Sequence, residues 1–414
     1  MEPHPQAPKG IWRLAEPARG GRGQRPGPLR LLGRRIGPGP DEPRRPLPPP
    51  DPRSIQAIVV WVLAPLGDTL FATPALHALR EGFPSATITG VCWAANRDLL
   101  ATNPDVDEWI SCANSADLPR ALSVVQNRPV DLSVGLSNVG SYLAAFHQVP
   151  YRIGFHSESL GWLWDFHFPE QLSGHAVDYC LSIVRALGVD TRQVSRRPQL
   201  WLLPEDRAWA DAFLAAEGWQ AGQTLIAIHP GGSHFAAKRW PLRDFSRLID
   251  VLLADPTRQV VLIGGRDDQR LAERIIAGMS GQRRPLIAAG RARLRRTAAL
   301  LERSAVMVGN DSGPLHMAAA VDTPVVALFG PTSPDNFRPL SSAQRVIWKA
   351  LPCSPCFRFL GGIQQYWPRQ LNPRCRRECM SLITVEEVVE AINELVRVSA
   401  GASYASEPLR PTGH

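Results

Sequence analysis

Long apolar runs are missing from this sequence. A helix that crosses a bilayer needs roughly 18 to 20 consecutive apolar residues, and the longest apolar run, residues 57–66, falls short of that. The N-terminus has arginines but no apolar stretch leading to a small-residue cleavage site, as a secretory signal would. We therefore expect a cytoplasmic protein without a transmembrane segment.

Two nucleotide-binding signatures are also absent. No G-x-G-x-x-G turn with a later acidic residue follows a predicted strand, and there is no G-x-x-x-x-G-K-[ST] loop. The first absence disfavours a nicotinamide-dependent dehydrogenase, and the second disfavours a P-loop enzyme.

Acidic residues are scarce at the N-terminus. Residues 1–53 hold eleven basic residues against five acidic ones, and they supply most of the net charge of +8. The same segment contains 14 of the 39 prolines, and such a composition cannot bury enough apolar surface to offset the chain entropy. We predict a disordered basic tail over residues 1–53, for which contact with anionic lipid headgroups is an alternative role. Because the remainder is nearly neutral, we expect no nucleic acid partner.

The seven cysteines, an odd number in a long chain, fit reduced thiols better than a disulfide framework. Four of them have a spacing close to that of a zinc ribbon, namely Cys353, Cys356, Cys375 and Cys379. The second pair is wider than usual. A structural metal or a redox-labile pair is one hypothesis and an ordinary loop is the other, so we assign no metal ligand.

From residue 55 onward, short apolar runs alternate with helical patterns. The 414 residues suffice for two or three domains at roughly 100 to 200 residues each. The first half predicts a helix through Leu70, Pro74, Leu76 and Leu79, a helix over 175–187, and strands at 57–63, 86–92, 107–111, 130–136 and 151–155. The second half predicts strands at 224–229, 259–265, 285–289, 305–309 and 324–330.

This alternation predicts an α/β protein of two Rossmann-like, doubly wound parallel-sheet domains. We place them at residues 54–198 and 199–398, followed by a flexible C-terminal tail at 399–414. In such sheets a ligand lies beyond the carboxyl ends of the strands. If the two sheets face each other, their post-strand turns line one central cleft.

The first such turn, residues 64–69, puts Asp68 at or just inside the N-terminus of the next helix, after Gly67. One interpretation is that Asp68 caps free backbone N–H groups. The other is that its carboxylate lies at the cleft and takes a proton from a hydroxyl.

A second turn joins glycines to a lysine. Gly231, Gly232 and Ser233 follow the strand at 224–229, and adjacent glycines there expose backbone N–H groups to an anion. Lys238 follows, one of only three lysines beside 43 arginines. A lysine in such a sequence suggests that a compact ammonium has a function here, with a solvated charge at a helix start as the alternative.

Asp267 and Asp268 follow the strand at 259–265. A carboxylate at this position could accept hydrogen bonds from ribose hydroxyls or an exocyclic amine, or it could cap the next helix.

Asp311, Ser312 and Gly313 follow the strand at 305–309, where a helix N-terminus suits a diphosphate. Asp311 would repel a nearby phosphate, so we assign it to sugar hydroxyls or to holding the loop. His316, one turn into this helix, is expected to be a packed core histidine.

Taken together, these segments resemble glycosyltransferase family 9, the ADP-heptose:lipopolysaccharide heptosyltransferases and their relatives. The resemblance runs from about residue 55 to about residue 398. It is carried by GDTLFATPALHALREGFPSATIT, RIGF, HAVDYCLSIVRALGV, HPGGSHFAAKRWPLRDFSRLI, VVLIGGRDDQRLAERI and VGNDSGPLHMAAAVDTPVVALFGPTSP.

The resemblance implies a GT-B fold, with the donor mainly on the second domain and the acceptor on the first. It implies an inverting, metal-independent transfer of a heptose or related sugar from ADP-heptose to the lipopolysaccharide inner core. The acceptor is then a lipid A-linked core at the inner face of the cytoplasmic membrane, where the protein would be peripheral. The nucleotide sugar is a substrate, and no cofactor is expected. No D-x-D pair stands at the carboxyl end of a predicted strand, which fits chemistry without a metal.

The resemblance also implies roles for particular residues. Asp68 matches the general base, and Lys238 matches the residue that neutralises the leaving ADP. The donor-binding loops are matched by Ser233, Asp311, Ser312 and Gly313, while Asp267 or Asp268 lies near the nucleoside. The chain departs from the family at Pro65-Leu66, where a polar or basic residue often precedes the Gly-Asp pair.

Two other functions are compatible with this sequence. An epimerase of the same fold would consume a nucleotide sugar without any acceptor. A non-catalytic scaffold would bind a nucleotide sugar without turnover, because fold alone does not imply activity.

Overall fold

The computed structural model describes residues 48–137, 149–154, 174–232, 236–360, 363–366 and 375–405. The chain divides into two compact units, Met1–Pro38 and Gly39–His414, and all of these residues belong to the second. Most of the predicted tail, residues 1–47, lies outside the described residues. At its end, Asp51 caps a short 3₁₀ helix, η1 (Pro52–Ser54), by accepting from the backbone N–H of Arg53. The predicted domain boundaries stay predictions.

The first half forms one five-stranded parallel sheet with the order β3-β2-β1-β4-β5. Its strands are β1 (Ala57–Val62), β2 (Thr87–Trp93), β3 (Glu108–Cys112), β4 (Leu132–Gly135) and β5 (Tyr151–Ile153). All five predicted strands are confirmed, with ends that differ by at most two residues. Every residue of β4 is buried, as expected where helices cover both faces of a parallel sheet.

The second half forms a six-stranded parallel sheet with the order β11-β10-β9-β6-β7-β8. Its strands are β6 (Thr224–His229), β7 (Arg258–Leu262), β8 (Leu286–Ile287), β9 (Val306–Asn310), β10 (Val325–Phe329) and β11 (Gln344–Trp348). The edge strand β11 was not predicted, because it is only partly buried and mixes polar with apolar residues. An antiparallel hairpin of β12 (Phe357–Leu360) and β13 (Ile363–Tyr366) was also not predicted.

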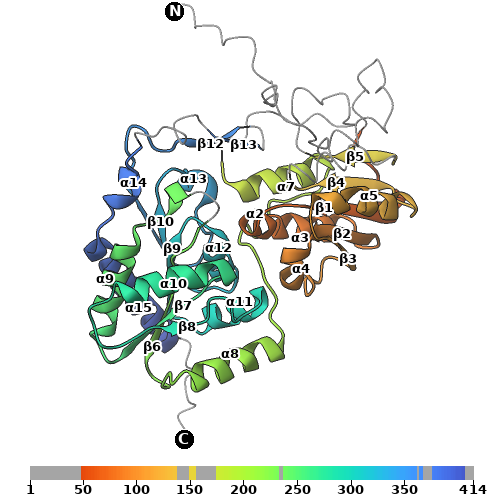
Figure 1. Cartoon of the computed structure of the whole chain (residues 1–414). Helices are drawn as coiled ribbons and strands as arrows, with labels where there is room; N and C mark the ends of the chain where they lie inside the picture. Colours follow the sequence, from red (N-terminus) through yellow and green to blue (C-terminus); the bar gives the residue numbers. More distant parts are fainter. Residues whose placement is uncertain are drawn as a thin grey trace, which may run out of the picture. The chain divides into compact units, whose positions relative to one another are not determined.

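Helices connect the strands in both halves (Figure 1). Those of the first half are α2 (Leu66–Phe71), α3 (Thr73–Gly82), α4 (Ala94–Leu100), α5 (Leu118–Gln126) and α7 (Ala176–Ala186). Those of the second half are α8 (Pro204–Ala216), α9 (Leu242–Leu253), α10 (Gln269–Ala277), α11 (Leu294–Glu302), α12 (Gly313–Ala320), α13 (Pro334–Phe337), α14 (Glu378–Ser381) and α15 (Val385–Ala405). Three short 3₁₀ turns complete the series: η2 (Ser115–Asp117), η4 (Ala236–Lys238) and η5 (Arg266–Asp268).

The single helix predicted through Leu70 and Leu79 is wrong, because the structure divides it into α2 and α3 at Ala72. Pro74 explains the division. A proline has no backbone N–H and is disfavoured inside a helix, but it suits the first turn, where it stands in α3. The short helix α2 therefore ends early and keeps its own N-terminus next to the end of β1.

The C-terminal helix α15 extends to Ala405, seven residues beyond the predicted end at residue 398. Residues 399–405 contain three alanines, the best helix formers, and the already formed helix continues through them despite Gly401. The last part of the predicted tail, residues 406–414, lies outside the described residues.

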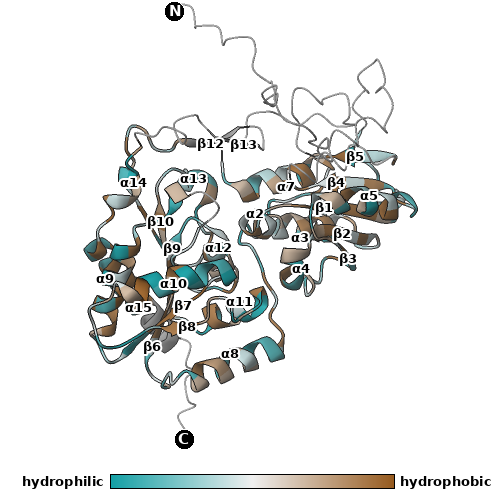
Figure 2. Cartoon of the chain, in the orientation of Figure 1, coloured by the Kyte–Doolittle hydropathy of each residue, from teal (hydrophilic) through white to brown (hydrophobic). Residues whose placement is uncertain are grey.

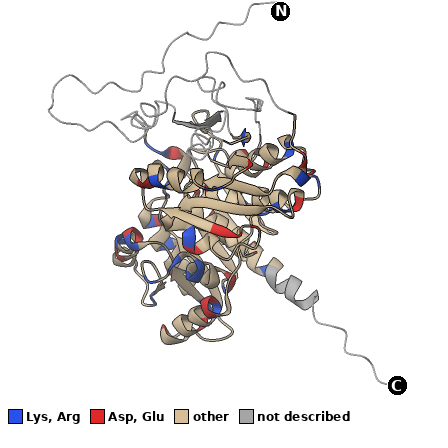
Figure 3. Ribbon diagram, turned by 90° about the vertical axis from the view of Figure 1, so that its right-hand side faces the viewer, with Lys and Arg blue, Asp and Glu red and all other residues tan. Residues whose placement is uncertain are grey.

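Polar and apolar residues alternate along the helices that cover the sheets, and α5 and α8 both carry teal and brown residues (Figure 2). Charged residues of both signs are scattered over helices and loops, while most strand residues are neutral (Figure 3). This distribution matches the expected near-neutral body. In the described part of the chain, no helix is both long and apolar enough to cross a membrane.

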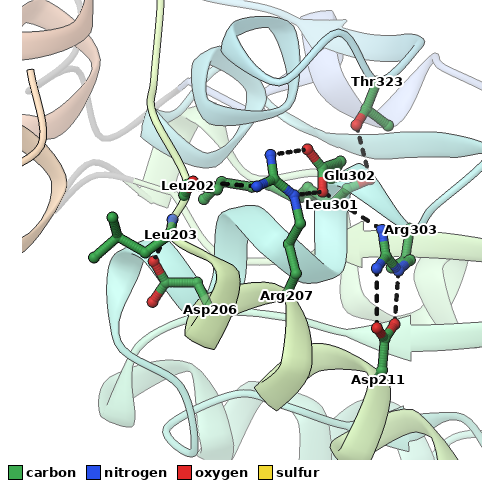
Figure 4. A network of polar contacts seen from close by, with 9 residues as sticks. All are labelled: Leu202, Leu203, Asp206, Arg207, Asp211, Leu301, Glu302, Arg303 and Thr323. Atoms are coloured by element: carbon green, nitrogen blue, oxygen red, sulfur yellow. Dashed lines mark hydrogen bonds and ion pairs between the residues drawn. The ribbon is translucent and has the colours of Figure 1, made fainter.

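Two Arg–carboxylate pairs fix α8 against α11 (Figure 4). Arg207 donates to Glu302 over 2.8 and 2.9 Å, and Arg303 donates to Asp211 over 2.7 and 2.9 Å. Both pairs are bidentate, which gives the contact a defined geometry. Because they are partly exposed, each contributes at most about 1 kcal/mol. They anchor the start of the second half to the helix that precedes β9.

Candidate active site

A cavity of about 760 Å³ collects post-strand turns from both sheets. From the first sheet it takes Pro65, Leu66, Gly67 and Asp68, which follow β1. From the second sheet it takes residues of the turns after β6, β7 and β9. A volume of this size suits a nucleotide-sized ligand. The expected central cleft is thus present where the carboxyl ends of the strands meet.

Most of the predicted site residues lie in this one place. The cavity is lined by Asp68, Gly232, Lys238, Asp268, Asp311, Ser312 and Gly313, among others. Gly231 lies just behind the wall, against Asp268. Ser233 lies outside the described residues.

Asp68 is in the first turn of α2 and is half-buried. The N-cap position belongs to Pro65 and no side chain caps the helix, so the capping interpretation of Asp68 is not supported. Burial raises the pKa of Asp68 to about 6, with Asp311 acting in the same direction and Lys238 against it. A carboxylate whose pKa lies near neutral pH is suited to accept a proton as a general base.

Lys238 ends η4 and is buried, which excludes the solvated-charge alternative. Its Nζ donates to Asp311 Oδ2 over 2.8 Å, and the hydroxyl of Thr332 donates to the same oxygen over 2.7 Å. A buried charge is tolerated when it is paired and hydrogen-bonded. Of the two roles expected for Asp311, the structure therefore supports the one that holds the site together.

Asn310 holds the glycine loop and is a residue that the sequence did not single out. Its side-chain amide donates to the carbonyls of Pro230 and Gly231 over 3.0 and 2.7 Å, and its Oδ1 accepts from the backbone of Trp240 over 2.9 Å. The side chain is fully buried. The sequence signal that could have identified Asn310 is a polar residue at the end of an otherwise apolar strand.

Asp268 combines the two roles that the sequence left open. Its Oδ2 accepts from the backbone N–H of Gly265 over 2.9 Å, so it does cap a turn, and it also lines the cavity. Although burial alone would raise its pKa, a hydrogen bond from His229 and the charge of that ring outweigh burial, so the pKa is lowered. Asp268 therefore presents an ionised carboxylate. Asp267 does not line the cavity.

The helix α12 begins at the cavity with Ser312 as its N-cap and Gly313 and Pro314 in its first turn. The N-terminal N–H groups and the helix dipole favour an anion there. Gly313 has a steric reason to be glycine, because a Cβ would lie 2.7 Å from side-chain atoms of Leu66. Leu66, one of the two residues that depart from the family, therefore packs on the start of α12.

His316 is buried in α12, as predicted, and also lines the cavity. Its ring meets Phe71 edge-on with the centroids 4.4 Å apart, and among the described residues its Nδ1 has no hydrogen-bond partner. Burial lowers its pKa to about 4, and the charges of His175 and Lys238 add to this while Asp311 opposes it. At neutral pH the ring is therefore uncharged.

The cysteines are free thiols, as expected. Within the described ranges, no group of three or more His, Cys, Asp or Glu side chains is placed to hold a metal ion. The four cysteines of the zinc-ribbon hypothesis lie within those ranges and do not form such a group, so the structure gives this hypothesis no support.

Comparisons with known proteins match this chain to one family. A model of the family described as glycosyltransferase family 9 (heptosyltransferase) matches residues 138–366. The chain is 29% identical over 310 residues to lipopolysaccharide heptosyltransferase 2 of Salmonella typhimurium, covering 70% of this chain and 87% of that protein. It is 26% identical over 346 residues to lipopolysaccharide heptosyltransferase 3 of Escherichia coli, covering 80% and 96% respectively.

Among solved structures, the chain is similar to the E. coli ADP-heptose lipopolysaccharide heptosyltransferase II. The TM-score is 0.67 at 24% identity, and the match covers 83% of this chain and 100% of that one. This likeness confirms the predicted GT-B fold. Since the family model spans more than half of its length, the chain belongs to glycosyltransferase family 9, the heptosyltransferases.

Proposed function

We propose that this glycosyltransferase moves a heptose from ADP-heptose to the inner core of lipopolysaccharide, with inversion at the anomeric carbon and without a metal ion. The observation that carries the proposal is the meeting of two groups in one cavity. Asp68 is a carboxylate with a pKa of about 6, and Lys238 is a buried ammonium beside the start of α12.

Asp68 acts on the acceptor in this proposal. Its carboxylate takes the proton of a sugar hydroxyl, and the freed oxygen attacks the anomeric carbon of the heptose. The bond from that carbon to the diphosphate breaks on the opposite face, which inverts the configuration. Because no hydrogen bond to another described residue occupies the Asp68 carboxylate, it is available to a hydroxyl.

Lys238 and α12 act on the leaving group. The departing ADP carries away the electron pair of the broken bond, and the extra negative charge needs stabilisation at that moment. The bond to Asp311 positions the ammonium in the wall of the cavity, close to the start of α12. The pairing also neutralises Asp311, which removes the repulsion that a lone carboxylate would exert on a diphosphate.

The acceptor side of the cavity is largely apolar, with Pro65, Leu66, Phe71 and Trp93 in its wall. We propose that a lipid A-linked core sugar enters there while the protein is peripheral at the inner face of the cytoplasmic membrane. The relatives named above are lipopolysaccharide heptosyltransferases, which supports this choice of acceptor.

The test uses purified full-length protein, ADP-heptose and a truncated core acceptor lipid, with ADP release and the product's anomeric configuration as readouts. Asp68→Asn should reduce turnover by at least about a hundredfold while ADP still binds. The control, Asp190→Asn, changes an exposed carboxylate paired with Arg192 and should leave turnover unchanged. Donor consumption without an acceptor would instead indicate an epimerase, and binding without any turnover would indicate a scaffold.

A further inference from the structure

His229 stands at a position that neither the sequence nor the proposed chemistry has yet assigned. It is the last residue of β6, which pairs with β9 on one side and with β7 on the other. Ser312 follows β9 and Asp268 follows β7. The ring of His229 therefore lies between two neighbouring turns that both line the cavity.

The ring contacts both turns at once. Its Nδ1 is 3.1 Å from the hydroxyl of Ser312, and its Nε2 is 3.4 Å from Asp268 Oδ2. The side chain is only 6% exposed, so its position is well defined by packing. One nitrogen thus contacts the start of α12, and the other contacts the acidic turn.

Gly231 makes this approach possible. A Cβ at Gly231 would lie 2.2 Å from Asp268 Oδ1 and 2.8 Å from His229 Nε2, and real Cβ atoms essentially never come that close to other heavy atoms. The glycine predicted to expose N–H groups to an anion therefore also leaves room for the ring and the carboxylate to meet.

The other hydrogen bonds of Ser312 and Asp268 indicate which atom donates in each of these contacts. The hydroxyl of Ser312 donates to the carbonyl of Asn310 over 2.9 Å, and a carbonyl can only accept. Its oxygen is then left to accept from Nδ1–H of His229. Asp268 Oδ2 already accepts from the backbone N–H of Gly265, so this oxygen is an acceptor for Nε2 as well. Both ring nitrogens therefore face acceptors, and the other charges around the ring are Arg239 near Asp268 and the Lys238–Asp311 pair.

We propose that His229 is a positioning residue for the nucleoside diphosphate of the donor, a proposal that rests on the function proposed above. Its ring holds the Ser312 turn and the Asp268 turn at a fixed separation. The diphosphate at α12 and the ribose hydroxyls at Asp268 can then bind at the same time. His229 touches neither the anomeric carbon nor the acceptor, so it acts through the two residues that it connects.

The decisive test measures coupling between Ser312 and Asp268. The affinity of ADP is measured by calorimetry for Ser312→Ala, Asp268→Asn and the double variant, first with His229 and then with His229→Ala. With His229 present, the double variant should lose less affinity than the product of the two single losses, by at least about threefold. In the His229→Ala background, the affinity loss of the double variant should equal the product of the two single losses. If it equals that product with His229 present as well, the proposal is overturned.

Two conservative variants separate the nitrogens. The amide nitrogen of asparagine lies near the place of Nδ1, and that of glutamine lies near the place of Nε2. His229→Asn should keep the Ser312 contact and His229→Gln the Asp268 contact, so each should recover part of the roughly tenfold affinity that His229→Ala loses. The KM for the donor should rise in all three variants, whereas kcat at saturating donor should stay within about threefold. A loss confined to kcat would contradict a positioning role.

A measurement without ligand keeps this inference separate from the proposed donor. In the free protein, the two ring ¹⁵N signals of His229 should respond to different neighbours, one shifting in Ser312→Ala and the other in Asp268→Asn. His77→Ala, a change at a partly exposed histidine on α3, is the control. If the ring signals shift in neither variant, His229 does not contact both turns, and the inference is overturned. If the expected signals appear but ADP does not bind, the contacts of His229 stand and ADP is rejected as the donor nucleotide.

Discussion

Lys238 Nζ lies 2.8 Å from Asp311 Oδ2, and this buried pair joins the turn after β6 to the turn after β9 in the wall of the cavity. Thr332 binds the same oxygen from the loop after β10. Three consecutive strands of the sheet, β6, β9 and β10, therefore each contribute one partner to a single network. The ammonium is held where the proposed leaving group needs it.

Removing the ammonium alone should affect both activity and folding. Lys238→Met leaves Asp311 buried without its cation, which should lower the free energy of unfolding by about 3 to 5 kcal/mol and greatly weaken donor use. The double variant Lys238→Met with Asp311→Asn should recover most of the stability but none of the activity. Urea unfolding and ADP release measure the two effects. Recovery of activity in the double variant would show that Lys238 serves the fold only.

Activity should depend on ionised Asp68. Because its pKa is raised to about 6, the carboxylate is deprotonated above pH 6, and kcat/KM should fall as the pH is lowered through that value. A pH profile of the wild-type protein, with Asp190→Asn as the matched control, measures this acidic limb. An acidic limb near pH 4 would mean that the cavity does not desolvate Asp68.

Ionised Asp68 should lower the free energy of unfolding at neutral pH. Its pKa in the folded protein is higher than the value of 3.8 that it has when exposed, so the folded state binds the proton more tightly. The stabilisation that this tighter proton binding gives the folded state is complete below pH 3.8 and is lost as the pH rises through about 6. Asp68→Asn should therefore raise the free energy of unfolding at pH 7, by up to about 3 kcal/mol, and have little effect at pH 4. Equal effects at both pH values would contradict this.

Gly231→Ala should disturb the cavity wall without adding a functional group. The new methyl group would press on Asp268 and His229, so we expect a loss of about 1 to 3 kcal/mol of stability together with weaker ADP binding. Gly265→Ala is the matched control for stability, since its Cβ would meet nothing closer than 3.9 Å. Thermal unfolding compares the two variants, and calorimetry measures ADP binding to Gly231→Ala against the wild-type protein. Equal behaviour would remove the steric reason for Gly231.

Chelation should not slow the reaction. The proposed charge stabilisation comes from Lys238 and the N-terminus of α12, so turnover should stay the same after dialysis against EDTA. Adding Mg²⁺ or Mn²⁺ should not increase it. A loss of turnover that a specific divalent cation restores would require a different account of the leaving group.

The sequence alone determined the architecture and the location of the site. Runs such as residues 225–228 and 325–329 are apolar throughout, which in a chain that alternates strands with helices favours a parallel sheet covered on both faces. Asp68, Lys238 and Ser312 each follow such a run. Because parallel strands all end at one edge, following a strand was enough to place each residue in one cavity.

What each residue does there was decided by tertiary structure. No sequence pattern states that Lys238 pairs with Asp311, that Asn310 holds the loop, or that His229 contacts two neighbouring turns. These contacts join strands that are distant in the sequence, and their partners depend on strand order. The pKa of Asp68 depends likewise on what packs around it, because desolvation is a property of the assembled cavity and not of the local sequence.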